Sequence, residues 1–217
     1  MSELNKRFLT SVLLLLILFL SFMDTKILYV ILIIINFLVI DEFIKMFKKI
    51  FKMNTFSYFL AIISMIIYLC YFTLVIIFFL TQSFEINKFK ILFILSICIS
   101  TDIGGYIFGK TIGGKKITKI SPNKTYSGLV GSFVISLIIG YSFQNVYDDV
   151  KLTVSNLFLV IMLISSISQA GDLIISIFKR KAKIKDTGSF LPGHGGILDR
   201  IDGVLLALPI GILIISI

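Results

Sequence analysis

Residues 56–80 read FSYFLAIISMIIYLCYFTLVIIFFL, a stretch without a single charged side chain. Crossing a hydrocarbon core of about 30 Å takes roughly 20 helical residues, so this stretch is long enough to span a bilayer. The rest of the chain has the same character, because 57% of its 217 residues are hydrophobic and its mean hydropathy is +1.03. Ordinary soluble domains are about 45–50% apolar. The sequence therefore predicts an integral membrane protein.

Uncharged runs predict seven membrane-spanning helices, and hence an all-α, polytopic transmembrane bundle. The predicted spans are residues 8–23, 27–40, 56–80, 91–108, 129–147, 152–178 and 203–217. With a cytoplasmic N-terminus, 17 of the 21 Lys and Arg residues face the cytoplasm, as expected from the retention of positive charge on that side. This asymmetry explains the net charge of +9 without nucleic acid as a partner. We expect one membrane domain over residues 1–217, with N-terminal spans in residues 1–100 and a second half, residues 101–217, that carries two cytoplasmic loops.

The sixth predicted span carries a stripe of polar side chains. They are spaced by four, three, four and three residues, which places them on one face of a helix. The stripe consists of Ser165, Gln169, Asp172, Ser176 and Lys179. A polar face inside a membrane must look into the bundle or into a water-filled cavity. Two interpretations stay open: a functional site around Asp172, or hydrogen bonding between helices.

The predicted cytoplasmic loop after the fourth span contains GKTIGGKK at residues 109–116 and ISPNKT at residues 120–125. Glycines let backbone N–H groups approach an anion, and lysines add positive charge, so the loop could cradle a phosphate. Its spacing is not that of a Walker loop, and any cytoplasmic turn would also contain Gly and Lys. Just before it, Asp102, Tyr106 and Lys110 share a helix face, which indicates either a functional site or an ion pair with a loop lysine.

The predicted loop after the sixth span continues into SIFKRKAKIKDTGSFLPGHGGILDRID at residues 176–202. Asp199 and Asp202 share a face if the last helix begins there. Together with Asp172 they would form an oxygen-rich site, which suits Mg²⁺ better than zinc. The lysines and Arg200 suit phosphates bridged by that metal. His194, the single histidine, is either a hydrogen-bonding turn residue or a catalytic group.

This second loop resembles the signature of the phosphatidate cytidylyltransferases, the CDP-diacylglycerol synthases. The family pattern is Ser-x-apolar-Lys-Arg, then Lys-Asp-x-small, then Pro-x-His-Gly-Gly-apolar-x-Asp-Arg-apolar-Asp, and residues 176–202 meet every position. The first loop is similar to the family's upstream motif at Thr101-Asp102, Tyr106, Gly109-Lys110, Gly113 and residues 120–125. It departs at Tyr126-Ser127-Gly128, where the family has an aromatic residue, Glu and Gly. That departure puts an acidic role at this position in doubt.

The resemblance implies that CTP and membrane phosphatidate react to give CDP-diacylglycerol and pyrophosphate at the cytoplasmic membrane face. It implies Mg²⁺ held by Asp172 and Asp199, with Asp202 as a third ligand or a support, and a second cation such as K⁺. The catalytic residues would be Asp172, Lys179, Lys185, His194, Asp199, Arg200 and Asp202. CTP would be held by Lys110, Ser121, Lys124 and Thr125. A homodimer is left open.

Two other functions remain open from the sequence. A related CTP-dependent lipid kinase, or a cytidylyltransferase acting on another lipid phosphate, would share the same headgroup chemistry. An ion-coupled transporter is a different class, since Asp102 and Asp172 fall inside predicted spans. The transporter is less favoured because the informative residues gather in cytoplasmic loops rather than at the membrane midplane.

Overall fold

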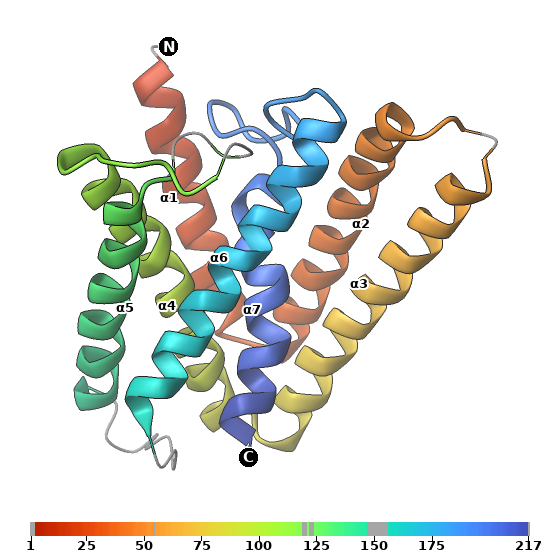
Figure 1. Cartoon of the computed structure of the whole chain (residues 1–217). Coiled ribbons are helices and arrows are strands. Elements are labelled where there is room, and N and C mark those ends of the chain that lie inside the picture. The colour runs from red at the N-terminus through yellow and green to blue at the C-terminus, as the bar shows by residue number, and fades with distance from the viewer. Residues whose placement is uncertain (1–2, 54, 119–120, 122–123, 147–155, 217) are drawn as a thin grey trace. The chain divides into compact units, whose positions relative to one another are not determined.

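The computed structural model describes residues 3–53, 55–118, 121, 124–146 and 156–216, and in these ranges the chain forms seven α-helices (Figure 1). They are α1 (Glu3–Ser21), α2 (Thr25–Ile50), α3 (Phe56–Gln82), α4 (Phe84–Thr111), α5 (Tyr126–Val146), α6 (Leu157–Lys181) and α7 (Leu198–Ser216). Pairing of the β type within the described ranges is limited to two isolated bridges. The prediction of an all-α fold is confirmed. The predicted span ends at residues 147, 152 and 217 lie outside the described residues.

Five of the described helices, α2 to α6, are long and apolar enough to cross a membrane. In α1 the apolar part is shorter, Phe8–Ser21. The last helix, α7, begins at Leu198 and therefore carries Asp199, Arg200 and Asp202 in its first two turns. The chain is a multi-pass integral membrane protein.

The helices extend beyond the predicted spans where charged residues begin. The second predicted span ends at residue 40, but α2 continues to Ile50. The charged residues of this extension alternate with Phe43, Met46 and Phe47, which are buried and keep the helical spacing of the apolar face. The positive charges of Lys48 and Lys49 in the last turn also interact favourably with the negative, C-terminal end of the helix dipole and so stabilise the helix. A charge therefore marks the edge of the apolar segment, whereas the helix itself continues past it.

The chain forms two compact units that do not follow the order of the sequence. Unit 1 consists of Met1–Ile77 and Phe178–Ile201, and unit 2 consists of Phe78–Ile177 and Asp202–Ile217. Unit 1 therefore contains most of the second predicted loop, and unit 2 contains the first. Each unit is described separately below.

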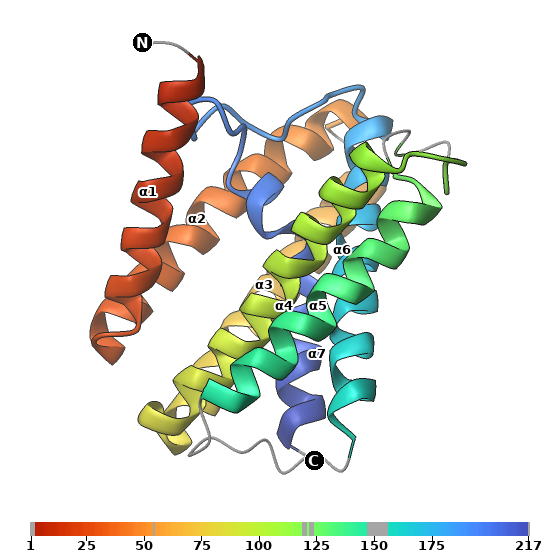
Figure 2. The ribbon, with the colours of Figure 1, turned by 90° about the vertical axis from the view of Figure 1, so that its left-hand side faces the viewer.

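Within unit 2, α4 and α5 run side by side at very short range (Figures 1 and 2). Glycines on both helices allow this approach, as is common where membrane helices meet. A Cβ atom at Gly128 would lie 2.8 Å from the carbonyl oxygen of Gly105, and one at Gly131 would lie 2.7 Å from Cδ2 of Phe108. Because these glycines have no side chains, the two helices can approach this closely.

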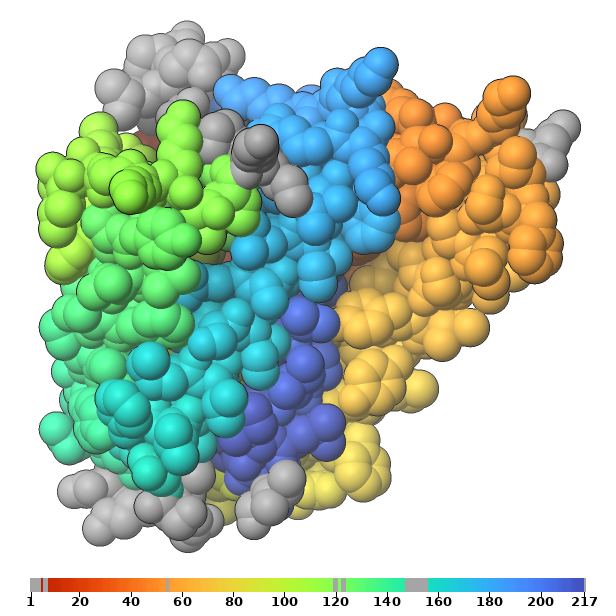
Figure 3. Space-filling view, viewed as in Figure 1, coloured from red at the N-terminus to blue at the C-terminus, as the bar shows by residue number. Residues whose placement is uncertain are grey.

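Hydrogen bonds connect α4 both to α6 and to α5. The Thr101 hydroxyl donates to Ser165 Oγ at 2.8 Å, and Ser132 Oγ donates to the Thr101 carbonyl at 2.8 Å. Further along, Ile161 of α6 packs where a side chain at Gly140 of α5 would lie, and Figure 3 shows the side chains of α5 and α6 in contact along one face of this unit. At Ser165 the polar stripe therefore makes a hydrogen bond between helices.

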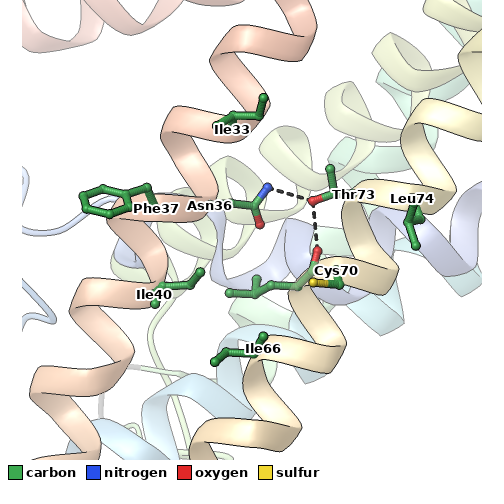
Figure 4. Close-up of a pocket in the computed structure, with 9 residues that line it drawn as sticks. Ile33, Asn36, Phe37, Ile40, Ile66, Cys70, Thr73 and Leu74 are labelled. Carbon is green, nitrogen blue, oxygen red and sulfur yellow. Dashed lines mark hydrogen bonds between the residues drawn. The ribbon is translucent and has the colours of Figure 1, made fainter.

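Within unit 1, α2 and α3 border an apolar groove with a volume of about 470 Å³ (Figure 4). It is lined by side chains from residues 33–40 of α2 and 66–74 of α3. Its polar contact is a hydrogen bond of 2.7 Å from Asn36 Nδ2 to Thr73 Oγ1, whose own hydroxyl donates to the Leu69 carbonyl. This pair joins the two helices inside the membrane segment.

Candidate active site

The first predicted loop supplies an ion pair to unit 2. Lys124 Nζ lies 2.5 Å from Asp172 Oδ2, and the two side chains are 25% and 27% exposed. Ser176, one turn further along α6, donates to the other oxygen, Asp172 Oδ1, at 3.3 Å. Because the pair keeps partial access to solvent, both charged groups can be reached by a ligand. The structure thus brings together two residues that the sequence placed in separate motifs.

Thr125 and Ser127 fix the backbone around Lys124. The Thr125 hydroxyl accepts the Gly128 N–H at 3.1 Å, which caps the N-terminus of α5. Ser127 Oγ donates to the Gly113 carbonyl and lies 2.9 Å from Thr125 Oγ1. Ser127, the position that departs from the family pattern, therefore ties the glycine turn of the loop to α5. Thr125 has a structural role here beside the nucleotide contact that the sequence predicts.

Two other residues predicted to bind CTP have partners that are close to them in the sequence. The Ser121 carbonyl accepts the Lys124 N–H at 3.0 Å, and the Ser121 N–H donates to Thr118 Oγ1 at 3.2 Å, so Ser121 shapes the turn that carries Lys124. Lys110 is exposed on α4 and reaches back to Tyr106, with Nζ 3.4 Å from the phenol oxygen. Asp102 is exposed on the same helix. Residues 120, 122 and 123 of the motif lie outside the described part of the chain.

The second predicted loop contains a more deeply buried ion pair in unit 1. Lys179 Nζ donates to Asp199 Oδ1 at 2.8 Å, and the two side chains are 14% and 7% exposed. The other oxygen, Asp199 Oδ2, accepts the N–H groups of Thr187 and Gly196 at 2.8 and 3.0 Å and lies 3.0 Å from Thr187 Oγ1. Asp199 therefore connects the end of α6, the loop and the start of α7.

The charge state of Asp199 follows from these contacts. Burial by itself raises the pKa of a carboxyl group, because it penalises the charged form. Here the hydrogen bond from Lys179, with those from the backbone of Thr187 and Gly196, outweighs burial, and the pKa of Asp199 lies below its ordinary value. Asp199 is an anion at neutral pH.

A glycine turn precedes α7 and holds His194. Gly193 and Gly195 have φ angles of +77° and +85°, which side-chain-bearing residues rarely adopt. Arg200 donates to the His194 carbonyl through Nε at 3.1 Å and through a terminal nitrogen at 2.7 Å. The His194 ring nitrogen Nδ1 makes a short hydrogen bond with Thr10 of α1. Arg200 and His194 together thus fix the turn, and among the described residues three of the five N–H groups of the guanidinium make no hydrogen bond.

Lys185 and Asp202 complete the set of predicted residues. Lys185 is exposed in the loop of unit 1. Asp202 is half-buried in unit 2, where its Oδ1 accepts the Gly203 N–H at 2.8 Å. Asp202 lies at a point of close helix contact, since a Cβ atom at Gly171 of α6 would lie 2.8 Å from its carbonyl oxygen.

Glu42 is a buried carboxylate that the sequence analysis missed. It lies on α2, is 4% exposed, and accepts the Ile197 and Leu198 N–H groups at 2.9 Å each and the Thr187 hydroxyl at 2.7 Å. Its position on the apolar face of α2, between Val39 and Met46, was the available signal, because a carboxylate on such a face requires partners.

The predicted magnesium site depends on carboxylates from both units. Carboxylate oxygens are the donors that Mg²⁺ prefers, so Asp172, Asp199 and Asp202 fit this ion by their chemistry. Across the part of the chain that the structure describes, no group of three or more His, Cys, Asp or Glu side chains gathers closely enough to hold a metal ion. Asp172 and Asp199 belong to different units, so the metal site stays a prediction.

The chain was then compared with known proteins. Residues 49–217, which include both loops and both ion pairs, match the model of the cytidylyltransferase family. The chain belongs to the cytidylyltransferase family. The resemblance seen in the signature residues is confirmed over most of the sequence. Thr10 and Glu42 lie before the matched segment.

Curated members of this family carry a more specific name. The chain is 40% identical over 129 residues to the phosphatidate cytidylyltransferase of Bacillus subtilis (strain 168), covering 58% of this chain and 48% of that protein. It is 41% identical over 138 residues to the protein of that name from Rickettsia bellii (strain RML369-C), covering 59% and 58%. The chain thus spans about half the length of the curated relatives that it matches.

Proposed function

We propose that this protein transfers the cytidylyl group of CTP to phosphatidate, giving CDP-diacylglycerol and pyrophosphate. The observation that carries the proposal is that residues of the two motifs and of the polar stripe form two lysine–carboxylate pairs, Lys124–Asp172 and Lys179–Asp199. The names of the relatives, which match at about 40% identity, support the same reaction.

The chemistry asks for charge neutralisation and alignment rather than a strong base. Phosphatidate is a phosphate monoester with a second pKa of about 6, so one of its oxygens is already an anionic nucleophile at neutral pH. That oxygen attacks the α-phosphorus of CTP, the bond from this phosphorus to the bridging oxygen of the β-phosphate breaks, and pyrophosphate leaves with the electron pair. The obstacle is repulsion between two anions, which positioned cations reduce.

The proposed roles follow from charge and access. Lys124 is the more exposed cation and would bind a phosphate of CTP, exchanging part of its contact with Asp172. Lys179 is held by Asp199 in one orientation and would bind a phosphate of either substrate. The free N–H groups of Arg200 and the exposed Lys185 would add positive charge at the same loop.

Mg²⁺ is part of the same proposal. Asp172 and Asp199 would hold it, with Asp202 as a third ligand or a support, and a second cation such as K⁺ would accompany it. When bound, Mg²⁺ would offset phosphate charge and polarise the reacting phosphoryl group.

We also propose a topology of seven spans with a cytoplasmic N-terminus, which puts both loops at the cytoplasmic face. This arrangement is supported by the distribution of Lys and Arg along the sequence. It suits a reaction in which the acyl chains of phosphatidate stay in the bilayer while its headgroup meets water-soluble CTP. A homodimer stays a prediction.

A substrate panel tests the proposed reaction. Purified protein in lipid nanodiscs is given labelled CTP and Mg²⁺ with phosphatidate, diacylglycerol or an isoprenyl phosphate in parallel. The proposal expects a cytidine-labelled lipid from phosphatidate alone. Labelled product from the isoprenyl phosphate instead would identify a different lipid phosphate, and phosphorylation of diacylglycerol would identify a kinase.

A further inference from the structure

Glu42 is a buried charge on α2 and lies before the segment matched by the family model. Its neighbours on the same face of α2, Val39, Phe43 and Met46, are buried apolar side chains. A carboxylate in such surroundings is costly unless hydrogen-bond donors surround it. The donors come from a distant part of the sequence, the signature loop at residues 187–198.

The contacts of Glu42 coincide with the start of α7. Oε1 accepts the Ile197 N–H and Oε2 accepts the Leu198 N–H, each at 2.9 Å, and Leu198 is the first residue of the helix. The first N–H groups of a helix have no partner within the helix and favour a negative charge. Glu42 therefore supplies the cap of α7 from another helix.

A single hydroxyl group links Glu42 to the predicted catalytic pair. Thr187 Oγ1 lies 2.7 Å from Glu42 Oε2 and 3.0 Å from Asp199 Oδ2. Asp199 in turn accepts from Lys179 through Oδ1. The order of contacts is Glu42, Thr187, Asp199 and Lys179, all within unit 1.

Two glycines of the signature leave room for this carboxylate. A Cβ atom at Gly188 would lie 2.7 Å from Glu42 Oε1, and one at Gly196 would lie 2.6 Å from the same oxygen. Both distances are far below ordinary contact, so the glycines at these positions and the glutamate on α2 belong to one packing arrangement.

We propose that Glu42 is a positioning residue of this enzyme: it holds the loop at residues 187–198 so that Asp199 presents Lys179 to the phosphates. Its role in catalysis rests on the proposed function, whereas its role in holding the loop does not. Glu42 acts through other residues and need not contact either substrate.

The test uses two variants and one matched control. Glu42→Gln keeps the size of the side chain but turns one acceptor into an amide donor that faces other donors. Thr187→Val removes the linking hydroxyl and keeps the backbone hydrogen bond to Asp199. Asp41→Asn is the control, because Asp41 is the neighbouring carboxylate, exposed and paired only with Lys45 among its described contacts.

The first measurement is hydrogen exchange by mass spectrometry, which does not depend on activity. Peptides that include Ile197 and Leu198 should exchange about tenfold faster or more in Glu42→Gln, as expected for the loss of a charge-assisted hydrogen bond. Peptides from the first loop, residues 113–118, should be unchanged. Wild-type exchange at Ile197 and Leu198 would overturn the proposal outright.

The second measurement is the kcat for CDP-diacylglycerol formation per folded molecule. We expect a loss of about 10- to 100-fold in Glu42→Gln and a loss in the same direction in Thr187→Val, with Asp41→Asn unchanged. The double variant should lose no more than Glu42→Gln alone, since both changes break one chain of contacts. If Glu42→Gln does not fold, Thr187→Val decides the catalytic part.

Each result separates the two proposals. Faster exchange with a wild-type kcat in both variants would show that Glu42 only stabilises the loop, and would overturn its positioning role. If the wild-type protein makes no CDP-diacylglycerol, the proposed reaction is wrong, and the exchange experiment still decides whether Glu42 holds the signature loop.

Discussion

Replacing Asp199 by Asn should lower the free energy of unfolding by more than the loss of one contact would lower it. The Lys179–Asp199 pair is 14% and 7% exposed, so the substitution removes the negative charge that faces the largely buried Lys179 ammonium. Removing one partner of a buried ion pair costs about 3–5 kcal/mol. Asn keeps one oxygen as an acceptor for the Thr187 or Gly196 N–H, so some of the loop contacts can persist. We therefore expect a loss near the lower end of that range.

The loss of stability in Asp199→Asn is compared with the loss in a variant of an exposed ion pair and with the loss in a double variant. Asp41→Asn breaks the exposed pair with Lys45 and should cost less than about 1 kcal/mol. Lys179→Met combined with Asp199→Asn removes both charges and should recover most of the lost stability, because no unpaired charge remains buried. The double variant should nevertheless remain inactive, since Lys179 is a proposed phosphate ligand.

The assay is equilibrium unfolding in mixed micelles, followed by the far-ultraviolet circular dichroism of the helices. The chain contains no tryptophan, so tryptophan fluorescence gives no signal. If Asp199→Asn loses no more stability than Asp41→Asn, or if the double variant is less stable than the single one, the account of this pair as a buried, mutually dependent interaction is wrong.

Three further predictions concern the metal, pH and helix packing. Asp172→Asn should insert into membranes but form no product. Chelation of Mg²⁺ should abolish product formation by the wild type until Mg²⁺ is restored. Normal turnover in either experiment would contradict the metal proposal. Folding lowers the pKa of Asp199, so the stability that this group contributes is complete above its unfolded pKa of about 4 and is lost as the pH falls through the folded value. The stability of the Lys179→Met, Asp199→Asn double variant should therefore fall less in acid than that of the wild type. An identical pH dependence would count against this. Gly131→Ala should destabilise the contact of α4 with α5, because its Cβ would meet Phe108, whereas Val130→Ala on the exposed face should change the unfolding midpoint little; equal effects would argue against close packing there.

The sequence predicted the fold class because uncharged runs in a membrane protein have few alternatives to helices. It predicted the helix ends less well. The helix α2 continues past Asp41 and Glu42 because Phe43 and Met46 are buried on its apolar face. The predicted span was ended at the first charged residue, which marks the edge of the apolar segment and not the end of the helix. The last predicted span begins at residue 203, whereas α7 begins at Leu198, which meets the condition under which Asp199 and Asp202 share a helix face.

The candidate site was predictable in its residues but not in its pairings. Lys179 and Asp199 were identified from the signature and Asp172 from the polar stripe. The structure pairs Asp172 with Lys124, which is distant in sequence. Such pairs depend on how helices pack, and spacing along one helix carries no information about them. Glu42 was missed for a related reason, because it serves a loop that begins 145 residues later in the chain.

The fate of labelled phosphorus shows whether the cytidylyl group of CTP moves to the lipid. Purified protein with phosphatidate and Mg²⁺ is given CTP labelled at the α-phosphate in one reaction and at the γ-phosphate in another. The account predicts that the α label enters the lipid fraction and that the γ label is released as pyrophosphate. Transfer of the γ label to lipid, or no labelled lipid from either nucleotide, would contradict it.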